Sequence, residues 1–580
     1  MPELDNAAVA RLLEQAADLL EISGADKYRF LAYRTAARNV RSWPEDVSKT
    51  AAEGRLTQIP GVGAKLAAAI ESILATGSFP ELDEVAAVLP PSLVTLMQIP
   101  GVGPKTARTL YDAAGVSTVD DLERAIADGT VRSLPGFGEA TVRALLEGIE
   151  RYRRLGERML LSDALPLAEK VAAEIAAVPG VVHVEPAGSI RRRKETVGDV
   201  DLLVASEEPA ALARALPGLP VVSDVIASGE AFHRLLTSSG IEVDLRVVEP
   251  RCWGAALQHF TGSAAHNVAL RERAKRMGLK VSEYGLARRS DGAVLACATE
   301  QDVYGALGLA TPPPEIREDA GEIEAAEAGM LPRLVELSDI RGDLHVHSVA
   351  TDGRSTLEQI RARAAELGYE YVAVTDHALG LRMVGGLDLD ALERQWDEID
   401  RLNAEGRGPQ LLKGIELNIG EDGEVDYPLE VLARFDLCIA SLHTGWGQPR
   451  ERATARVLSA MENPYVDVIG HLTGRVLRRR EPIALDVEAI VAKAAETGTV
   501  LELDAYPDRL DIDDSIVRMA VEAGALISID TDAHEVSQMA FMRYGVWQAR
   551  RGWATREHVL NARSLDQMLG ALKRSRPPRF

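Results

Sequence analysis

The stretch GSIRRRKETVGDVDLLV, residues 188–204, places four consecutive basic residues shortly before two aspartates. Its second half reads as a β-strand, in which alternate side chains face the same side. Asp199 and Asp201 therefore share one face, while the apolar residues beside them take the other. Two carboxylates so close together repel each other unless a cation lies between them. The stretch therefore predicts a site for divalent metal ions.

The size and composition of the chain indicate several globular domains. It has 580 residues, of which 46% are hydrophobic and 26% charged, values typical of a soluble protein. No apolar run approaches the roughly 18 to 20 residues of a membrane span, and the acidic amphipathic start lacks the features of a secretion signal. The three cysteines lie far apart and fit neither a disulfide framework nor a cysteine zinc site. We expect a cytoplasmic monomer with no membrane partner.

The net charge of −23 by itself argues against a nucleic-acid partner, but the charges are unevenly distributed along the chain. Residues 311–580 hold 31 basic and 47 acidic side chains, whereas residues 1–310 hold 34 and 41. Because the acidic excess lies mostly in the second half, basic clusters in the first half remain available for binding nucleic acid.

The first 150 residues are helical in pattern and contain a repeat. LTQIPGVGAKLAAAI (56–70) and LMQIPGVGPKTARTL (96–110) nearly match, and VRSLPGFGEATVRAL (131–145) is a looser third copy. In each copy a Pro-Gly-x-Gly turn leads into a helix, whose first backbone N–H groups offer a phosphate site. The alternative, a plain glycine-capped turn between helices, is disfavoured by the repetition. The units resemble helix-hairpin-helix motifs, and this resemblance implies contacts to the DNA backbone at Gly61, Gly63, Lys65, Gly101, Gly103 and Lys105.

Beyond residue 160 the pattern becomes mixed α and β. Strands are expected at 181–188, 199–205 and 241–248, and Asp244 lies on the polar face of the last one. It offers a third carboxylate from a neighbouring strand. Three carboxylates can hold two Mg²⁺ or Mn²⁺ ions, which would activate a 3′-hydroxyl and stabilise a leaving pyrophosphate. The alternative is a set of surface aspartates on an edge strand.

Two motifs carry a family resemblance. Gly188-Ser189, followed about ten residues later by Asp-x-Asp, resembles the palm motif of the nucleotidyltransferase superfamily, and HFTGSAAHNVALR (259–271) resembles the nucleotide-pocket segment of the family X DNA polymerases, the family of DNA polymerase beta. The resemblance implies catalytic, metal-binding carboxylates at Asp199, Asp201 and Asp244. It implies contacts to the triphosphate from Ser189, Arg192 and Gly198, to the sugar from Phe260 and Gly262, to the base from Asn267, and to the template strand from Arg271.

Two positions depart from the family pattern. His259 stands where the family usually has tyrosine, which leaves the sugar selectivity open. Ala69 stands where the beta-type lyase has its lysine, and an alanine cannot form an imine with an abasic sugar. We therefore expect little or no Schiff-base lyase activity.

After an acidic, proline-started linker at 311–338, seven apolar strand-like runs alternate with helical stretches. The runs are DLHVHS (343–348), YVAVTDH (371–377), LLKGIEL (411–417), LCIASLH (437–443), DVIGHL (467–472), TVLELDA (499–505) and LISIDTDAH (526–534). This rhythm predicts a parallel α/β barrel, in which chemistry lies at the carboxyl ends of the strands.

The block 343–534 resembles the PHP (polymerase and histidinol phosphatase) domain. The resemblance implies nine metal ligands, of which six are among the chain's 11 histidines: His345, His347, Asp352, His377, Glu416, His443, His471, Asp532 and His534. Mixed imidazole and carboxylate ligands suit a cluster of Zn²⁺ or Mn²⁺ ions. A relic barrel without metal is the alternative, and Asp504 stands where the family typically has asparagine. The implied activity is a 3′–5′ exonuclease, with abasic-site cleavage as a further candidate and phosphomonoester hydrolysis as a rival.

We predict a multidomain protein of α and α/β classes. Its parts are an N-terminal helical domain (1–85), a second helical DNA-binding domain (86–155), a nucleotidyltransferase palm (156–250), a thumb (251–310), a linker (311–338) and a PHP barrel of (β/α)7 type (339–580). The predicted function is repair synthesis on gapped or nicked duplex DNA from deoxynucleoside triphosphates, as in base excision repair. The alternatives are a small-molecule nucleotidyltransferase fused to a phosphatase and a non-catalytic DNA-binding scaffold.

Overall fold

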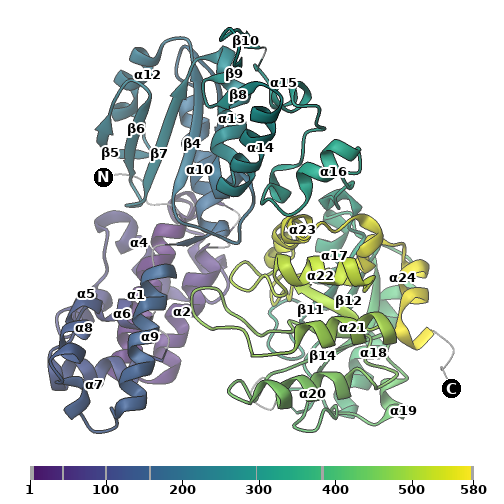
Figure 1. Cartoon of the computed structure of the whole chain (residues 1–580). Helices are drawn as coiled ribbons and strands as arrows, with labels where there is room; N and C mark the ends of the chain where they lie inside the picture. Colours follow the sequence, from purple (N-terminus) through teal and green to yellow (C-terminus); the bar gives the residue numbers. More distant parts are fainter. Residues whose placement is uncertain are drawn as a thin grey trace. The chain divides into compact units, whose positions relative to one another are not determined.

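The computed structural model describes residues 6–41, 43, 45–97, 99, 101–155, 158–295, 297–380 and 385–575 (Figure 1). The chain divides into two compact units. The helical-palm unit comprises Met1–Met159, Leu165–Glu185 and Gly198–Val247, and the thumb-barrel unit comprises Leu160–Ala164, Pro186–Val197 and Val248–Phe580. Among the residues described, no helix combines the length and apolar character needed to cross a membrane.

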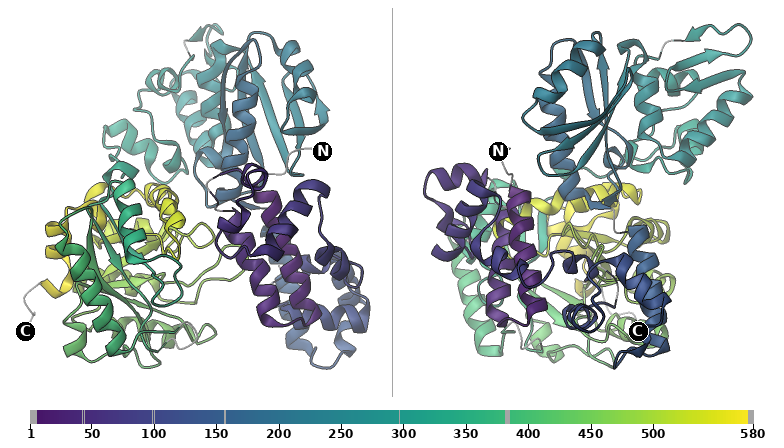
Figure 2. Two further views of the ribbon diagram at one scale, coloured as in Figure 1. Left: turned by 180° about the vertical axis from the view of Figure 1, so that it is seen from behind. Right: turned by 90° about the vertical axis from the view of Figure 1, so that its left-hand side faces the viewer.

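The first part of the helical-palm unit consists of helices, drawn in purple and dark blue in Figure 2. They are α1 (Asn6–Ser23), α2 (Lys27–Arg41), α3 (Val47–Ala52), α4 (Ala64–Thr76), α5 (Pro80–Ala86), α6 (Leu93–Leu96), α7 (Pro104–Ala114), α8 (Val119–Ala127) and α9 (Glu139–Leu155), with short 3-10 turns η1 (Leu56–Gln58) and η2 (Val131–Ser133). Helix α1 contacts α2 and α4 to α7, and its buried Leu13 and Leu19 lie in their shared core. An apolar stripe along α1 therefore organises these helices.

The palm is a five-stranded sheet with the order β2-β4-β7-β6-β5. Its strands are β2 (Val181–Pro186), β4 (Val200–Ser206), β5 (Val222–Ser228), β6 (Phe232–Thr237) and β7 (Glu242–Val248), with helices α10 (Leu161–Ala176) and α12 (Pro209–Ala215). In β7 the apolar residues at 243, 245 and 247 are buried and the polar residues between them are more exposed, as the alternation predicted. Strand β6 pairs antiparallel with β7 and places Arg234 opposite Asp244.

The thumb part of the second unit combines helices with a three-stranded antiparallel sheet. Its elements are α11 (Gly188–Arg191), α13 (Trp253–Thr261), α14 (Ala264–Arg276), β8 (Leu279–Ser282), β9 (Gly285–Arg288), β10 (Val294–Leu295) and α15 (Glu300–Ala306), and the short strands β1 (Met159–Leu160) and β3 (Thr196–Val197) pair separately. Leu270 of α14 and the Tyr304 side chain of α15 are fully buried in its core.

The segment 311–338, predicted as a linker, is folded. It forms η5 (Pro314–Ile316), α16 (Glu322–Ala328) and η6 (Leu337–Asp339), and Ile323 of α16 lies in the thumb core. Its Arg317 is 1% exposed and pairs with Glu300. The Glu322 carboxylate is also buried, 2.5 Å from His266 Nδ1. Charge pairing lets these residues be buried within an acidic segment.

The C-terminal part is a seven-stranded parallel sheet in strict sequence order, curved into a nearly closed barrel. The strands are β11 (Gly342–Val346), β12 (Tyr371–Val374), β13 (Gln410–Asn418), β14 (Leu437–Ser441), β15 (Val468–Gly470), β16 (Val500–Asp504) and β17 (Ile527–Asp530). Each lies within or overlaps a predicted run. A parallel bridge between Val346 and Ala533 joins the end of the last strand to the first.

Helices lie outside the barrel strands in the views of Figures 1 and 2. They are α17 (Leu357–Glu366), α18 (Leu389–Ala404), α19 (Leu429–Leu432), α20 (Arg450–Ala460), α21 (Val487–Thr497), α22 (Asp514–Ala523), α23 (Met542–Arg551) and α24 (Leu565–Ala571). Helices α21 and α22 end at Gly498 and Gly524, both in the left-handed conformation that favours glycine. The strands are buried on both faces, which explains their continuous apolar runs.

Candidate functional sites

The nine predicted barrel ligands come from the strands or from the residues that follow them. His345 lies in β11 and Glu416 in β13, while the other seven follow the carboxyl ends of β11, β12, β14, β15 and β17. Parallel strands in sequence order bring these ends to one rim. The structure therefore gathers residues that are nearly 190 positions apart in the sequence at one place.

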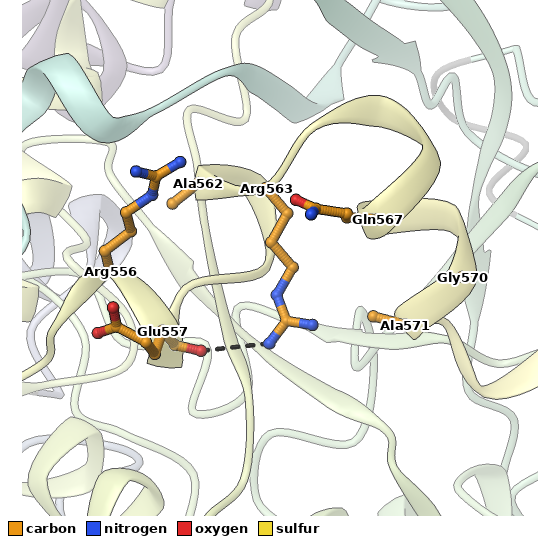
Figure 3. Close-up of a pocket in the computed structure, with 7 residues that line it drawn as sticks. All are labelled: Arg556, Glu557, Ala562, Arg563, Gln567, Gly570 and Ala571. Carbon is orange, nitrogen blue, oxygen red and sulfur yellow. Dashed lines mark hydrogen bonds between the residues drawn. The ribbon is translucent and has the colours of Figure 1, made fainter.

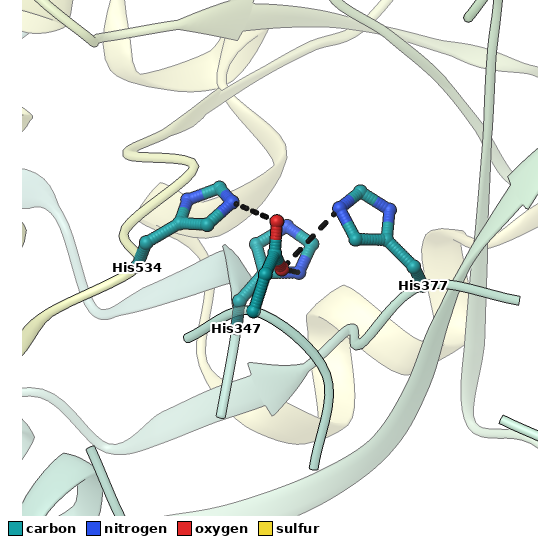
Figure 4. A group of neighbouring side chains, drawn as sticks. His347, His377 and His534 are labelled. Atoms are coloured by element: carbon teal, nitrogen blue, oxygen red, sulfur yellow. Dashed lines mark ion pairs between the residues drawn. The ribbon is translucent and has the colours of Figure 1, made fainter. Parts of the chain in front are cut away.

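Three groups of side chains at this rim have ligand atoms within 4.8 Å of one another. The groups are His347, Asp352, His377 and His534; His345, His347 and Asp532; and His377, Glu416 and His443. Figure 4 shows His347, His377 and His534 turned toward a common centre. His347 and His377 each belong to two groups, so the ligands form one continuous cluster.

Glu416 is the central carboxylate of the cluster. Its oxygens lie 2.7 Å from His377 Nδ1, 2.9 Å from His471 Nε2 and 3.0 Å from His443 Nε2. His471, which belongs to none of the three groups, thus also lies beside the cluster. On the other side, Asp532 Oδ1 lies 3.0 Å from His347 Nε2.

Several buried polar atoms of the cluster have no hydrogen-bond partner among the residues that the structure describes. They are His345 Nε2, both ring nitrogens of His347, Asp352 Oδ1, His377 Nδ1, Glu416 Oε2 and His471 Nδ1. Some of them lie at ion-pair distance from an opposite charge without forming a hydrogen bond, as His377 Nδ1 and Glu416 Oε2 do at 2.7 Å. Leaving such an atom unsatisfied costs about 1 to 3 kcal/mol. A divalent metal ion would satisfy several of them at once, and the imidazole and carboxylate set is the chemistry that Zn²⁺ and Mn²⁺ accept. The residues present therefore fit a metal cluster.

The charges of the cluster are strongly coupled. Burial alone would lower the pKa of His345, but the carboxylates of Glu502, Asp532 and Glu416 outweigh it and raise that pKa well above its usual value. For Glu416, burial is likewise outweighed by the neighbouring histidines, which hold its pKa well below the usual range. Burial lowers the pKa of His347 to about 4, so its ring stays neutral and able to bind metal.

Two residues that support the cluster were missed in the sequence. Glu502 in β16 lies 2.5 Å from His345 Nδ1, and Asn418 Oδ1 lies 2.7 Å from His443 Nδ1. Such contacts fix the ring orientation of a metal-binding histidine. Glu502 stands two positions before Asp504, so both face the same side of β16, and a carboxylate between two leucines of a strand was the available signal. Asp504 itself is fully buried, and its Oδ2 lies 3.5 Å from Arg509.

The backbone at two ligands is strained. His471 has φ +24° and Asp532 has φ +48°, values that non-glycine residues adopt at a cost of about 1 to 3 kcal/mol. His471 follows β15 directly, and Asp532 follows β17 after one residue. Backbone strain of this kind concentrates at functional sites, where the fold holds a side chain in place.

A pocket of about 640 Å³ lies elsewhere on the barrel, between the last helices (Figure 3). It is lined by Arg556, Glu557, Ala562, Arg563, Gln567, Gly570 and Ala571. Arg563 donates a 3.2 Å hydrogen bond to the carbonyl of Glu557. None of these residues belongs to the cluster, so the pocket is not the metal site.

The palm carboxylates are arranged more openly. Asp199 precedes β4 and is exposed, Asp201 lies on β4, and Asp244 lies on the adjacent β7. In the part of the chain that the structure describes, the three do not form a group with ligand atoms within 4.8 Å. The guanidinium of Arg234 instead binds both oxygens of Asp244, at 2.7 and 2.9 Å. This neighbouring cation offsets the charge repulsion that the sequence predicted.

The basic stretch 191–194 divides its charges among different partners. Arg191 forms a forked pair with the buried carboxylate of Glu300, at 2.8 and 3.0 Å. The guanidinium of Arg193 lies 4.4 Å above the ring of Trp547, and Arg192 binds Glu318 and the carbonyl of Thr261. Ser189, half-buried at the start of the stretch, lies in α11, and Gly198 is exposed just before Asp199.

The other predicted nucleotide-pocket residues lie at the junction of α13 and α14. Phe260 is in α13, and Gly262 follows that helix at φ +71°, where an added Cβ would lie 3.0 Å from Arg192 Nη1. Asn267 accepts from Gln258 Nε2 and donates to the carbonyl of His259, each at 2.7 Å. Arg271 is exposed on α14. The His259 ring packs edge-on against Phe260, with centroids 5.1 Å apart.

The three repeats form helix, turn and helix as predicted. Gly61, Gly101 and Gly136 begin the turns at φ +73°, +89° and +88°, and helices α4, α7 and α9 follow. The residue between the two glycines is buried in each copy, and the glycines are exposed. The copies differ in charge. The first two copies have Lys65 and Lys105 at the second residue of the helix, whereas the third has Ala140 there, directly after Glu139. An acidic residue at the helix start disfavours an anion.

The lyase position is buried. Ala69 is 7% exposed and faces the core around α4, while Lys65 is exposed and pairs with Glu81. A lysine at position 69 would have to leave that core to reach a sugar. The expectation of little lyase activity therefore remains a prediction.

Comparisons with known proteins match four regions of the chain. Family models match a helix-hairpin-helix domain at residues 4–79, a tandem of helix-hairpin-helix motifs at 93–151, the DNA polymerase beta thumb at 256–318 and the PHP domain at 343–505. A Bacillus subtilis protein described as DNA polymerase/3′–5′ exonuclease PolX is 35% identical over 98% of this chain and 99% of its own length.

This chain belongs to the family X DNA polymerases that carry a PHP domain.

Two further relatives of this family X chain each match only part of it. DNA polymerase lambda of Rattus norvegicus is 28% identical over 52% of the chain and 55% of its own length. A probable phosphatase of Syntrophotalea carbinolica is 32% identical over 40% of the chain and 95% of its own length. The predicted fold is confirmed: helix-hairpin-helix regions, a polymerase thumb and a parallel PHP barrel occur in the predicted order.

Proposed function

We propose that this family X polymerase fills short gaps in duplex DNA by adding deoxynucleotides at Asp199, Asp201 and Asp244, and trims 3′ ends at the barrel cluster. The observation that carries this proposal is the pairing of two unlike sets of ligands in one chain. One is a set of three carboxylates, two on the adjacent palm strands β4 and β7 and one just before β4, and the other is a buried histidine-rich cluster. The full-length similarity to the Bacillus polymerase and exonuclease supports it.

At the palm, Mg²⁺ or Mn²⁺ held by the three carboxylates would lower the pKa of the 3′-hydroxyl and neutralise the phosphates. The chain's own residues would orient the substrates. Arg192 offers its guanidinium to the triphosphate, and Asn267, whose amide is fixed on both sides, borders the base. A pre-oriented group loses little entropy on binding, which favours the reaction.

At the barrel, Zn²⁺ or Mn²⁺ ions bound by the nine ligands would supply a nucleophile for phosphodiester hydrolysis. The protein holds the ligands rigidly, with Glu502 and Asn418 fixing two histidine rings. Phosphatase activity is the second candidate for this half, because a probable phosphatase matches it over 95% of its own length.

For DNA, we propose backbone contacts at Gly61, Gly63 and Lys65 and at Gly101, Gly103 and Lys105, whose glycines are exposed at helix starts. Two such sites at separate turns fit a gapped or nicked duplex. We further propose that the chain works as a cytoplasmic monomer.

We also propose that the chain has no Schiff-base lyase activity, because Ala69 cannot form an imine. Borohydride trapping on an incised abasic duplex tests this proposal, since efficient covalent capture would contradict it.

The test of the proposed function uses a labelled primer on a gapped duplex, with and without dNTPs, in Mg²⁺ or Mn²⁺. Extension with dNTPs and 3′ shortening without them are expected. A small phosphomonoester such as p-nitrophenyl phosphate is offered in parallel. Hydrolysis of that ester without any shortening of DNA would make the barrel a phosphatase, and no extension in either metal would contradict the polymerase assignment.

A further inference from the structure

The loop that carries the predicted triphosphate ligand is held by helix α23 of the barrel. Arg551, the last residue of α23, is 2% exposed by its side chain. Its Nη1 donates to the carbonyl of Arg192 at 2.9 Å and to the carbonyl of Glu315 at 3.2 Å. Its Nη2 donates to the Asp514 carboxylate at 2.5 Å. One buried arginine thus joins the loop to the barrel.

Further residues of the same stretch contact the same part of the barrel. The guanidinium of Arg193 lies 4.4 Å above the Trp547 ring. The Glu195 carboxylate accepts from Arg475, at 3.2 and 2.6 Å, and from Gln548 at 3.2 Å. Positions 547 and 548 lie four and three residues before position 551 in α23, so each is its neighbour on the helix surface. That face meets residues 192, 193 and 195 of the loop.

The backbone of the loop needs such support. Arg193 has φ +56°, a left-handed conformation that costs a non-glycine residue about 1 kcal/mol or more. The residues on both sides of it are fixed by polar contacts: Arg192 through Arg551, and Lys194 through Glu318 at 3.6 Å. A strained conformation persists only where its surroundings determine it.

The side chain of Arg192 is fixed through the same arginine. Glu318 accepts from Arg192 Nε at 3.0 Å, and Arg551 Nη1 lies 3.3 Å from the same carboxylate oxygen. Nη1 of Arg192 donates to the carbonyl of Thr261, and its Nη2 has no partner among the described residues. Arg551 therefore fixes Arg192 at its carbonyl and at its counterion, and leaves one guanidinium nitrogen for a phosphate oxygen.

We propose that helix α23 of the PHP barrel is a positioning element of the polymerase: Arg551, with Trp547 and Gln548, holds loop 191–195 so that Arg192 meets the incoming triphosphate. The inference rests on the proposed function, because it takes Arg192 as the triphosphate ligand. It assigns to the barrel a role in nucleotide binding that is separate from its metal cluster. Arg551 is a positioning residue and has no contact with a reacting atom.

The test measures single-nucleotide gap filling over a range of dNTP concentrations, together with direct binding of the dNTP–Mg²⁺ complex by calorimetry. Arg551→Lys keeps the charge but loses the forked geometry, and Arg551→Ala loses both. We expect KM and Kd for dNTP to rise about tenfold or more with a smaller change in kcat, since ground-state binding is what suffers. Trp547→Ala should raise KM less. The 3′–5′ nuclease rate should stay at the wild-type level.

Arg550→Ala is the matched control. Arg550 is adjacent to Arg551 on the same helix, and its replacement removes the same charge. Arg550 binds the Glu315 carboxylate and the Val335 carbonyl, and neither of these groups belongs to the loop. Its KM for dNTP should stay unchanged. Folding is checked by melting temperature and by nuclease rate. Where Arg551→Ala fails this check, Arg551→Lys and Trp547→Ala carry the test.

A folded Arg551→Lys protein with wild-type KM and Kd for dNTP would overturn the inference. An equal rise of KM in Arg550→Ala would also overturn it, because the effect would then be one of general charge. If the wild-type protein neither binds nor incorporates dNTP, the proposed function fails and the inference falls with it. That outcome is distinct, since the wild-type reference itself is then inactive.

Discussion

The two candidate metal sites of this chain are built in opposite ways. In the palm, Asp199 is exposed, and Asp244 is held by an arginine from the next strand. In the barrel, the ligands converge around Glu416, and several of their polar atoms are buried without a hydrogen-bond partner among the described residues. Solvent and a neighbouring cation can stabilise the palm carboxylates without metal. The barrel ligands instead form a preorganised site that gains most from a bound ion.

The two sites should differ in how far metal binding depends on the substrate. An oxygen-only site with exposed carboxylates binds Mg²⁺ weakly and shares it with substrate phosphates. An imidazole-rich, buried site holds transition metals much more tightly. We therefore expect the barrel metals to stay with the protein, and the palm metals to arrive with the nucleotide.

The largest effect is expected from a double substitution that disrupts the barrel site alone. Replacing both His345 and His347 with alanine removes two fully buried ligands that share the β11 end. Nuclease activity should fall by about a hundredfold or more, because residues that bind the metal directly determine its affinity. Nucleotide addition should stay within about twofold of the wild-type rate. Both activities are assayed on one purified protein. His558→Ala, outside the cluster, is the control and should leave both unchanged.

If nuclease activity stays at the wild-type level in the double variant, the barrel is not the nuclease. If nucleotide addition collapses as well in a folded protein, the two metal sites do not work independently. A melting transition close to that of His558→Ala separates this result from simple unfolding.

The reciprocal change is Asp244→Ala in the palm. It should reduce nucleotide addition by about a hundredfold, since we propose that this carboxylate shares metal ions with Asp199 and Asp201. DNA affinity and nuclease rate should not change. Asp224→Ala on the edge strand β5 is the matched control, because it removes an exposed carboxylate from the same sheet. Normal extension by Asp244→Ala would remove the palm assignment.

A moderate effect is expected at the hairpins. Gly101 and Gly136 have φ +89° and +88°, are exposed, and have open space around an added Cβ, so alanine strains both turns equally. Of these two repeats, only the second has a lysine at the helix start. Gly101→Ala should therefore weaken DNA binding about five- to thirtyfold, given a strain of about 1 to 2 kcal/mol, whereas Gly136→Ala should change it less than about twofold.

Fluorescence anisotropy on gapped duplex at fixed salt measures both affinities. Equal losses in the two variants would mean that the third repeat also binds the backbone, despite Glu139. Equal melting temperatures of the two proteins verify that the strain is matched.

The smallest effect concerns the structural charge next to the nucleotide pocket. Burial alone would raise the pKa of Glu300, but Arg191 and Arg317 outweigh it and hold that pKa at about 2. A carboxyl group with a depressed pKa stabilises the folded state above its unfolded pKa of about 4.3, and this stability is lost as pH falls toward about 2. Glu300→Gln should thus lower Tm at pH 7, and the difference from wild type should shrink between pH 4 and pH 3.

Thermal melting at pH 7, 4 and 3 measures this difference. Glu249→Gln is the control, because Glu249 pairs with Arg251 on the surface and should affect Tm little at any pH. A Tm difference for Glu300→Gln that stays constant with pH would show that the lost stability is not electrostatic.

The fold was predictable because its signals are local. Seven apolar runs gave seven strands, and a parallel sheet in sequence order brings their ends together without further information. Glu502 was not predicted as a support for His345, since the two are 157 positions apart and no periodicity links them. The hydrogen bond from Arg551 to the Arg192 carbonyl joins residues 359 positions apart. The basic stretch alone did not indicate which of its residues would contact the barrel. The folded elements of the segment 311–338, predicted as a linker, were also not foreseen, because buried charge pairs are invisible in the sequence.

The most direct test of the difference between the two sites is the metal content of purified protein after dialysis against metal-free buffer, measured by inductively coupled plasma mass spectrometry. Wild type, Asp244→Ala and the His345, His347 double variant are compared at equal concentration. We predict tightly bound Zn or Mn in wild type and in Asp244→Ala, and most of it lost in the double variant. Wild-type protein without bound metal, or a folded double variant that keeps the full amount, would contradict the account.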